Sequence, residues 1–392
     1  MRRRTRAMAV ALCTVVLCGI ALAAGQGGTD PGAGAAPYES AEAFGEALFF
    51  DVSLSKTRRQ ACATCHDPGN AFTDPRENAA GRAASLGDDG LSLGDRNAPS
   101  AAYAMVSPPF GQSADGTYRG GQFHDGRASD LAEQARGPLL NPVEMGLADI
   151  GEAAARILSN PRYAATLHAL YPEGTAEDPE AAFSAATAAI TAFEKTDLFA
   201  PFDSKYDRYL RGEASLTRQE ELGRLLFFSQ QFTNCNQCHQ LRRSPVAKDE
   251  TFTDYSYHNI GVPANLALRE INGVAGPDEG LLQNQAVDDP AQAGKFKVPS
   301  LRNVAVTGPY MHNGVFGDLR TVVLFYDRYN SKSAARQINP ETGKPWRAPE
   351  VEGTLSMREL TDAPALDDER IDALVAFLKT LTDKRYEPLL SE

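Results

Sequence analysis

Two short segments of the chain combine thiols and an imidazole at a spacing that can do chemistry. Cys62–His66 has the sequence Cys-Ala-Thr-Cys-His, and Cys235–His239 has the sequence Cys-Asn-Gln-Cys-His. Two thiols three positions apart can add to the two vinyl groups of one haem, and the adjoining histidine then lies beneath the iron as its proximal ligand. Because the motif occurs twice, the sequence predicts two covalently attached haem c groups, held by Cys62, Cys65, His66, Cys235, Cys238 and His239.

A zinc clip, a disulfide and a redox-active Cys-x-x-Cys pair are the alternative interpretations of these four cysteines. The remaining two of the six cysteines, Cys13 and Cys18, lie near the N-terminus. Two copies of one motif, each with its own histidine, favour haem attachment over all three alternatives.

The N-terminus predicts export. Four arginines precede an apolar run from Ala7 to Ala24, so residues 1–24 are expected to be a cleaved signal peptide and residues 25–37 a flexible tether. A retained membrane anchor is the alternative, because a spanning helix needs about 20 apolar residues. We expect no stable membrane insertion after signal removal, and a location in the periplasm.

Charge argues against a nucleic-acid partner. The chain has 392 residues and a formal charge of −12, which becomes −16 once the four arginines of the signal peptide are removed. Binding to nucleic acid depends on Lys and Arg that neutralise phosphates, so we expect no such partner.

The elements that must position the two motifs are mainly helical. Apolar residues recur at helical spacing in several segments, whereas strand patterns are sparse. The sequence predicts helices over Ser40–Phe50, Leu131–Arg136, Ile150–Leu158, Pro179–Lys195, Thr217–Phe228, Leu319–Tyr326 and Asp367–Leu381.

An internal repeat points to duplication. Gly45–Phe50 precedes the first motif and the similar Gly223–Phe228 precedes the second. The predicted fold class is mainly α, with long loops, little β structure and two cytochrome c-like haem domains, residues 38–200 and 201–392.

Other histidines offer few further iron ligands. His168 is expected to pack among apolar neighbours of a helix. His258 is expected to be a satisfied loop histidine or a partner of a haem propionate.

Four further segments carry a family resemblance. Phe123–Arg127, Asn141–Met145, Lys297–Asn303 and Gly308–Gly314 resemble the bacterial dihaem cytochrome c peroxidase superfamily. The resemblance is strongest to its methylamine-utilisation branch and extends over nearly the whole mature chain. It implies a haem-dependent, peroxidase-type oxidoreductase with hydrogen peroxide as acceptor.

The resemblance implies that the first haem is high-spin and open on its distal face. No histidine lies between His66 and His124, where classical members carry a removable distal ligand. Glu144 would be the distal acid/base group, Gln134 its hydrogen-bonding partner and Pro138 a steric wall. Without the motif, a single Glu in an acidic protein is more often a surface residue.

The second haem would be six-coordinate, with Tyr326 as the axial ligand fourteen residues after His312. A phenolate is a hard anionic donor that stabilises the higher oxidation states of iron. Met311 is the rival ligand. The alternative for Tyr326 is a helix residue on an aromatic face beside Phe325 and Tyr329.

A calcium ion is also implied by the resemblance. Asn97 would give its side-chain oxygen, and Thr307 and Pro309 their backbone carbonyls. Oxygen donors of this kind suit calcium.

Two positions depart from the family. His124 replaces a tryptophan between the haems, and Thr233 replaces a surface tryptophan, which leaves Trp346 as the only tryptophan. His124 is expected to relay charge through hydrogen bonds, to become a ligand, or to pack; these three interpretations stay open.

The resemblance implies that peroxide produces a high-valent state shared by the two haems. That state would oxidise tryptophans of a methylamine dehydrogenase precursor and so build its tryptophan tryptophylquinone cofactor. One alternative is a peroxidase that takes electrons from a small cytochrome c or cupredoxin. Another is a dihaem electron carrier without catalysis.

Overall fold

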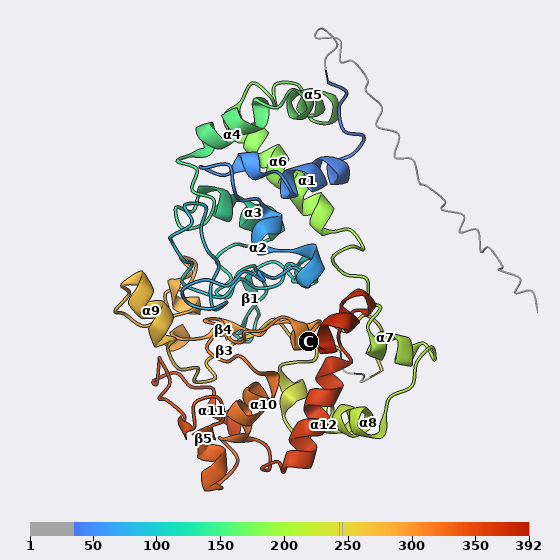
Figure 1. Cartoon of the computed structure of the whole chain (residues 1–392), viewed down its shortest axis with the longest axis vertical. Coiled ribbons are helices and arrows are strands. Elements are labelled where there is room, and N and C mark those ends of the chain that lie inside the picture. The colour runs from blue at the N-terminus through green and yellow to red at the C-terminus, as the bar shows by residue number, and fades with distance from the viewer. Residues whose placement is uncertain (1–34, 243, 245, 392) are drawn as a thin grey trace, which may run out of the picture.

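The computed structural model describes residues 35–242, 244 and 246–391. The predicted signal peptide, residues 1–24, and residues 25–34 of the predicted tether lie outside the described residues. Figure 1 shows two stacked halves: the first part of the chain, blue to green, forms the upper half, and the yellow to red part forms the lower half.

Helices dominate both halves, which confirms the mainly α prediction. The first half holds α1 (Ala41–Phe49), α2 (Cys62–Cys65), α3 (Leu131–Leu140), α4 (Ile150–Leu158), α5 (Pro161–Leu170) and α6 (Pro179–Glu194). The second half holds α7 (Lys205–Leu210), α8 (Arg218–Phe227), α9 (Leu266–Asn272), α10 (Leu319–Asp327), α11 (Met357–Thr361) and α12 (Asp368–Lys379). Short 3-10 turns lie at Val52–Leu54, Pro68–Asn70, Ala104–Val106, Cys235–Gln237, Leu281–Gln283, Pro290–Gln292, Val304–Val306, Ala334–Gln337 and Lys384–Ser391.

The strands of the described residues are two residues long and pair in three antiparallel ladders. These ladders join β1 (Gly111–Gln112) to β2 (Tyr118–Arg119), β3 (Tyr257–His258) to β4 (Phe296–Lys297), and β5 (Ile338–Asn339) to β6 (Lys344–Pro345). In the middle ladder Tyr257 faces Lys297 and His258 faces Phe296.

Two predicted helix ends were wrong. Helix α3 continues past Arg136 to Leu140, although Pro138 lies inside it. The N–H of Asn141 bonds to the carbonyl of Gly137 at 3.0 Å, so the last turn closes despite the proline. The final helix ends at Lys379 rather than at Leu381.

Helix α5 was missed although its start carries a usable signal. Asn160 accepts a hydrogen bond from the N–H of Arg162, and Pro161 occupies the first turn. Asparagine at the N-cap and proline at the first helical position are typical of helix starts.

The internal repeat is present in the structure as two matched helix pairs. Helix α1 packs on α6, and α8 packs on α12 in the same way. A Cβ added at Gly45 would lie 1.9 Å from the carbonyl oxygen of Ala189, and one added at Gly223 would lie 1.9 Å from that of Ala373. Both pairs therefore depend on a glycine where the helices cross.

Replacing Gly45 or Gly223 by alanine is expected to destabilise the folded protein by about 1–3 kcal/mol through overpacking. Alanine alone would favour each helix by about 1 kcal/mol, so a loss of stability isolates the steric effect. The midpoint of guanidinium unfolding of the haem-loaded protein measures it. Gly353→Ala is the control, because an added Cβ there has no atom within 4 Å. Equal stability of the Gly45 and Gly353 variants would contradict the close packing.

Two apolar cores lie above and below the middle of the molecule. Buried side chains of the first core include Phe44, Phe49, Phe183, Phe193 and Phe199. Those of the second include Tyr206, Phe227, Leu374, Phe377 and Leu381. The predicted domain limits at 38–200 and 201–392 stay a prediction.

Buried polar contacts lie within the second half and between the two halves. Within the second half, the guanidinium of Arg302 binds both carboxylate oxygens of Asp207, and both side chains are nearly inaccessible to solvent. Between the halves, one buried hydrogen bond involves Tyr103. The hydroxyl of Tyr103 donates to Asp383 at 2.6 Å across 280 residues of sequence.

Candidate haem-binding site

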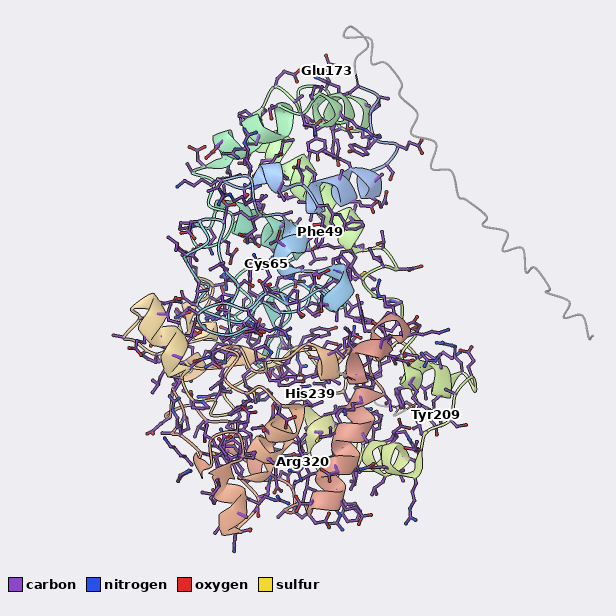
Figure 2. All side chains as sticks on the ribbon, viewed as in Figure 1. Phe49, Cys65, Glu173, Tyr209, His239 and Arg320 are labelled. Atoms are coloured by element: carbon purple, nitrogen blue, oxygen red, sulfur yellow. The ribbon has the colours of Figure 1, made fainter. Side chains whose placement is uncertain are left out.

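One large cavity lies between the two halves and is lined by both Cys-x-x-Cys-His motifs. Figure 2 places Cys65 in the upper half, near α2, and His239 in the lower half. The cavity therefore joins two sites that are 173 residues apart in sequence.

The residues of both motifs fit a covalently bound haem. All four cysteines are free thiols. The Nδ1 atom of His66 lies 3.2 Å from the carbonyl oxygen of Phe72, and Nδ1 of His239 lies 3.2 Å from that of Phe252. A hydrogen bond from Nδ1 to a carbonyl orients the ring and leaves Nε2 for a metal.

The two carbonyl acceptors belong to residues with the same unusual backbone conformation. Phe72 and Phe252 both adopt a left-handed conformation with φ of 55°. This conformation is rare for a bulky residue, and its occurrence at equivalent positions shows that the duplication extends to the detail of each site.

The alternative roles of the cysteines do not fit. Burial raises the pKa of Cys62 to about 12 and that of Cys65 to about 11, whereas a redox-active pair requires a lowered pKa. Within residues 35–391, apart from 243 and 245, no cluster of three His, Cys, Asp or Glu side chains converges as a zinc site would require.

The predicted distal residues belong to a segment that packs beside the first motif, because Cys62 packs against the apolar cluster that contains Ala135, Leu139 and Met145. Gln134 and Pro138 are one turn apart on α3, so they lie on the same helix face. Glu144 follows on a turn in which its N–H bonds to the carbonyl of Asn141 at 3.0 Å. All three line the cavity, and their predicted roles stay predictions.

Glu144 lines this cavity in a setting that favours its protonated form. Burial raises the pKa of its carboxyl above the usual 4.5, while the charge of Arg127 and the side chain of Asn141 oppose the shift. A carboxyl with a raised pKa can exchange a proton nearer neutral pH than a surface glutamate can.

Tyr326 lines the cavity from α10, together with Leu319, Val322 and Val323 of the same helix. Burial raises the pKa of its phenol, and the nearby thiols of Cys235 and Cys238 add to the shift. Its position beside the second motif is consistent with the predicted axial ligand.

The neighbours of Tyr326 differ from it in surroundings. Phe325 packs in a separate buried cluster with Phe316 and Trp346, and the hydroxyl of Tyr329 donates to the carbonyl of Ile260. Met311, the rival ligand, also lines the cavity. The assignment of Tyr326 over Met311 stays a prediction.

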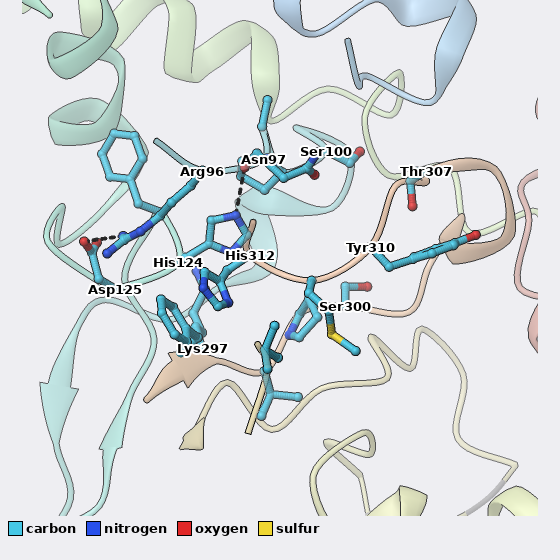
Figure 3. A pocket seen from close by; sticks show the side chains of 18 of the residues that line it. Arg96, Asn97, Ser100, His124, Asp125, Lys297, Ser300, Thr307, Tyr310 and His312 are labelled. Atoms are coloured by element: carbon cyan, nitrogen blue, oxygen red, sulfur yellow. Dashed lines mark hydrogen bonds and ion pairs between the residues drawn. The ribbon is translucent and has the colours of Figure 1, made fainter. Parts of the chain in front are cut away.

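His124 lies in the middle of the cavity wall, beside His312 (Figure 3). Its Nε2 atom lies 2.9 Å from the carbonyl oxygen of Asn97. Burial lowers the pKa of His124 to about 4, so the ring is neutral and Nε2 donates to that carbonyl. His124 thus contacts a residue of the predicted calcium site, and its three interpretations remain predictions.

The prediction for His168 was wrong. Its side chain is 58% exposed and lies 3.9 Å from a carboxylate oxygen of Glu177. The buried residues of α5 are Tyr163, Thr166 and Leu167, whereas the end of the helix that contains His168 and Leu170 is exposed. His258 lies on β3 rather than in a loop, and its two ring nitrogens lie near the hydroxyls of Ser256 and Ser356. It also lines the cavity, so its role as a partner of a haem propionate stays a prediction.

Thr233, the second position that departs from the family, and Trp346, the single tryptophan of the sequence, have different surroundings. Thr233 is buried, and its hydroxyl donates to the carbonyl of Leu226 at 2.6 Å. Trp346 packs against Phe316 and Phe325 and is not among the described residues that line the cavity.

Several polar groups of the cavity were missed by sequence reasoning. Lys297 is half-buried, and its ammonium donates to the carbonyl of Gly121. The ring of His312 stacks on Phe296 at 3.6 Å, and neither ring nitrogen has a hydrogen-bond partner in the described part of the chain. Both belong to segments quoted for the family resemblance, which was the only signal available.

Known proteins resemble this chain over most of its length. Residues 39–215 match the family model described as di-haem cytochrome c peroxidase. The chain is 55% identical over 352 residues to the methylamine utilization protein MauG of Paracoccus denitrificans, a match that covers 89% of this chain and 90% of that protein. It is 29% identical to the cytochrome c551 peroxidase of Nitrosomonas europaea, over 86% of this chain and 78% of that one.

The fold is similar to a solved structure as well. The crystal structure of the diheme peroxidase BthA from Burkholderia thailandensis superposes with a TM-score of 0.78 at 36% identity, covering 89% of this chain and 87% of that chain. The two Cys-x-x-Cys-His motifs, the cavity that both of them line and the mainly helical fold agree with a family of di-haem proteins. The chain belongs to the di-haem cytochrome c peroxidase family, and within it the protein is a MauG-like, haem-dependent oxidoreductase of the peroxidase type.

Proposed function

We propose that this protein uses hydrogen peroxide to oxidise tryptophans in a precursor of methylamine dehydrogenase, and so matures its tryptophan tryptophylquinone cofactor. The observation that carries the proposal is the unequal lining of the cavity. Glu144 and Gln134 lie near the first motif, while the phenol of Tyr326 lies near the second. The choice of substrate follows the name of the relative that is 55% identical.

Each motif would hold one haem through its two thioethers and its histidine. The bound haem irons would supply the redox chemistry, which the protein side chains alone lack. Reduction of one hydrogen peroxide to two waters consumes two electrons and two protons, and the electrons come from the protein substrate.

Three side chains near the first motif have separate roles in the reaction with peroxide. The Glu144 carboxylate takes the proton from the near oxygen of peroxide and returns it to the departing oxygen. The amide of Gln134 orients the peroxide by a hydrogen bond, and Pro138 restricts what else enters. A protein substrate is too large for this cavity, so it docks on the surface and only electrons move inward.

At the second motif, Tyr326 would help to hold the haem through its phenol oxygen. The phenol would lose its proton on binding iron, and metal binding would supply the driving force for that loss. A hard anionic ligand favours oxidised iron, so the haem held there would be suited to retain an oxidising equivalent.

The test is addition of one equivalent of hydrogen peroxide to the haem-loaded, oxidised protein, with and without precursor methylamine dehydrogenase. We expect an optical change that is long-lived alone and is discharged by the precursor, with quinone absorption appearing in the precursor. Rapid decay, with turnover only when reduced cytochrome c is supplied, would refute the proposal.

That second outcome corresponds to a peroxidase that takes electrons from a small cytochrome c or cupredoxin. The observation that favours it is the buried Thr233 beside the second motif. Trp346, the single tryptophan of the sequence, is not among the described residues that line the cavity. No tryptophan of that lining therefore offers an electron path from the second site to a partner on the surface.

We further propose one calcium ion in a small cavity between the halves. Asn97, Thr307 and Pro309 line this cavity together. The Asn97 amide nitrogen donates to the carbonyls of Arg82 and Ala83, which leaves its oxygen for a cation. Asp74 and Arg82 also line the cavity, and their opposite charges cancel. The remaining ligands of the calcium ion would therefore be neutral oxygens, including those of water molecules.

Calcium is expected to stabilise the folded protein by about 2.7 kcal/mol at 100 times its Kd. Asn97→Ala is expected to abolish this gain, because the mutation removes the side-chain oxygen. Thermal unfolding after chelation and readdition measures it. Magnesium is the control, since it demands shorter octahedral bonds. An equal calcium effect in the Asn97 variant would contradict the site.

We propose that the mature protein acts in the periplasm. The basic and apolar N-terminus supports export. None of the helices in the described part of the chain has the length and hydropathy needed to span a bilayer. Cell fractionation with a periplasmic marker enzyme tests this location.

A further inference from the structure

We propose that Tyr103 is a redox-active residue, which gives one electron to the peroxide-oxidised haem centre and its phenolic proton to Asp383. The inference rests on the proposed reaction with peroxide. It adds a protein-based site where an oxidising equivalent can reside before the substrate is oxidised.

Tyr103 lies on the wall of the cavity and at the junction of the two halves. It is among the cavity-lining residues, and its side chain is 2% exposed. The backbone takes a left-handed conformation with φ of 60°, held by a hydrogen bond from the N–H of Tyr103 to the carbonyl of Phe199 at 3.0 Å. The position is therefore shielded from water and close to the cofactor space.

The hydroxyl of Tyr103 has a defined proton acceptor. It donates to Oδ1 of Asp383 at 2.6 Å, and it accepts a hydrogen bond from the N–H of Phe202 at 3.2 Å. Because the incoming N–H occupies one lone pair, the phenolic proton is directed to the carboxylate. A distance of 2.6 Å is within the range for direct proton transfer.

Asp383 is suited to take that proton. Its side chain is inaccessible to solvent, and its Oδ2 accepts a hydrogen bond from the Asn303 amide at 2.8 Å. Burial raises the pKa of this carboxyl, so it is more basic than a surface aspartate. Its Oδ1 faces the phenol.

Burial determines the form of the oxidised tyrosine. The guanidinium of Arg302 lies 5.3 Å from the centre of the Tyr103 ring, but its pairing with Asp207 leaves no net charge there. Among the described residues, a cationic ring in this buried setting would have no unpaired anion beside it other than Asp383, which accepts the phenolic proton. The electron and the proton must therefore leave together, and the product is a neutral tyrosyl radical.

Tyr103 is singled out among the aromatic residues near the haem sites. Of the four tyrosines that line the cavity, it is the one whose hydroxyl donates to a carboxylate in the described part of the chain. Tyr326 is the proposed iron ligand, and the hydroxyl of Tyr255 has no hydrogen-bond partner among the described residues.

Oxidation of Tyr103 transfers one electron and one proton to different acceptors. The O–H bond of Tyr103 breaks, an O–H bond forms on Asp383, and one electron reduces the oxidised haem centre by one equivalent. Reduction of the radical by the substrate returns the proton to the phenol.

The test is rapid-freeze electron paramagnetic resonance of the haem-loaded protein after one equivalent of hydrogen peroxide, without a protein substrate. We expect an organic radical whose hyperfine splitting collapses when the tyrosines are ring-deuterated. Tyr103→Phe is expected to remove this signal. Asp383→Asn, which keeps the phenol but removes the base, is expected to slow its formation by about 10²–10⁴-fold.

Tyr255→Phe is the matched control, because Tyr255 is also buried and lines the same cavity. The radical should persist in this variant. Absence of a tyrosyl signal in the unmodified protein, or its persistence in Tyr103→Phe, would overturn the inference, and the first result needs no variant to fold.

The same samples separate this inference from the proposed function. Peroxide-driven optical changes and precursor oxidation without a Tyr103 radical would refute the inference alone. If peroxide produces no optical change, the proposed function fails. A photogenerated ruthenium(III) oxidant then tests Tyr103 directly: a Tyr103 signal supports the inference and its absence refutes it.

Discussion

Replacing Cys62 and Cys65 together by serine is expected to lower the haem content from two per chain to one. Serine hydroxyls do not add to vinyl groups under the conditions in which thiols do, so the first haem loses its covalent attachment. The expected loss of the peroxide reaction is complete, because Glu144 and Gln134 lie near this motif. Pyridine haemochrome absorbance and intact mass measure the haem content.

The matched variant replaces Cys235 and Cys238 by serine. It should also retain one haem, but the first site should still react with peroxide, and the substrate should no longer be oxidised. Cys13 and Cys18 lie in the predicted signal peptide, so the unmodified protein is the two-haem reference for both double variants. Two haems in either double variant would contradict the assignment of the motifs.

Replacing Glu144 by glutamine is expected to slow the reaction with hydrogen peroxide by about 10²–10⁴-fold, the usual contribution of a positioned acid/base group. Glutamine keeps the size and hydrogen bonding of the side chain but cannot exchange a proton. Stopped-flow absorbance of the haem-loaded protein measures the rate constant. Glu152→Gln is the control, since Glu152 is partly exposed on α4, pairs with Arg156 and is not among the described residues that line the cavity.

The pH dependence of that rate carries a definite sign. The active form of Glu144 is the carboxylate, because it must accept the proton of peroxide. Burial raises its pKa above 4.5, so the rate should fall as pH decreases through a value higher than that of an ordinary glutamate. The fall should be absent in Glu144→Gln. Glu144 would be excluded as the base if the rate in the unmodified protein did not depend on pH. It would also be excluded if the Glu144→Gln variant showed the same fall of the rate at low pH.

Local sequence patterns predicted haem attachment and several of the longer helices, but not α5, α7, α9 or α11. The spacing of Cys62, Cys65 and His66 places all three within about one helical turn, and α2 begins at the first of these residues. The periodicity of apolar residues located α1, α4, α6 and α8 to within a residue or two at each end. Such patterns succeed because backbone geometry alone determines which neighbours in sequence share a face.

The exposure of single side chains could not be predicted from their neighbours in sequence. His168 has apolar neighbours in sequence but lies at the exposed end of α5. Glu144 looks like a surface residue by composition, yet it lines the cavity. The residue type is the same in either setting, and only the packing around it sets its exposure and its pKa.

The sequence by itself determined that this protein attaches two haems, is mainly helical and is duplicated, because these properties depend on residues close together in the chain. Only the tertiary structure decided which distant residues meet. Tyr103 reaches Asp383 across 280 residues, and Asn97 shares a cavity with Thr307 and Pro309. These contacts form because the two halves, each with its own apolar core, pack against each other around a common cavity. The spacing of residues along the chain does not predict that arrangement.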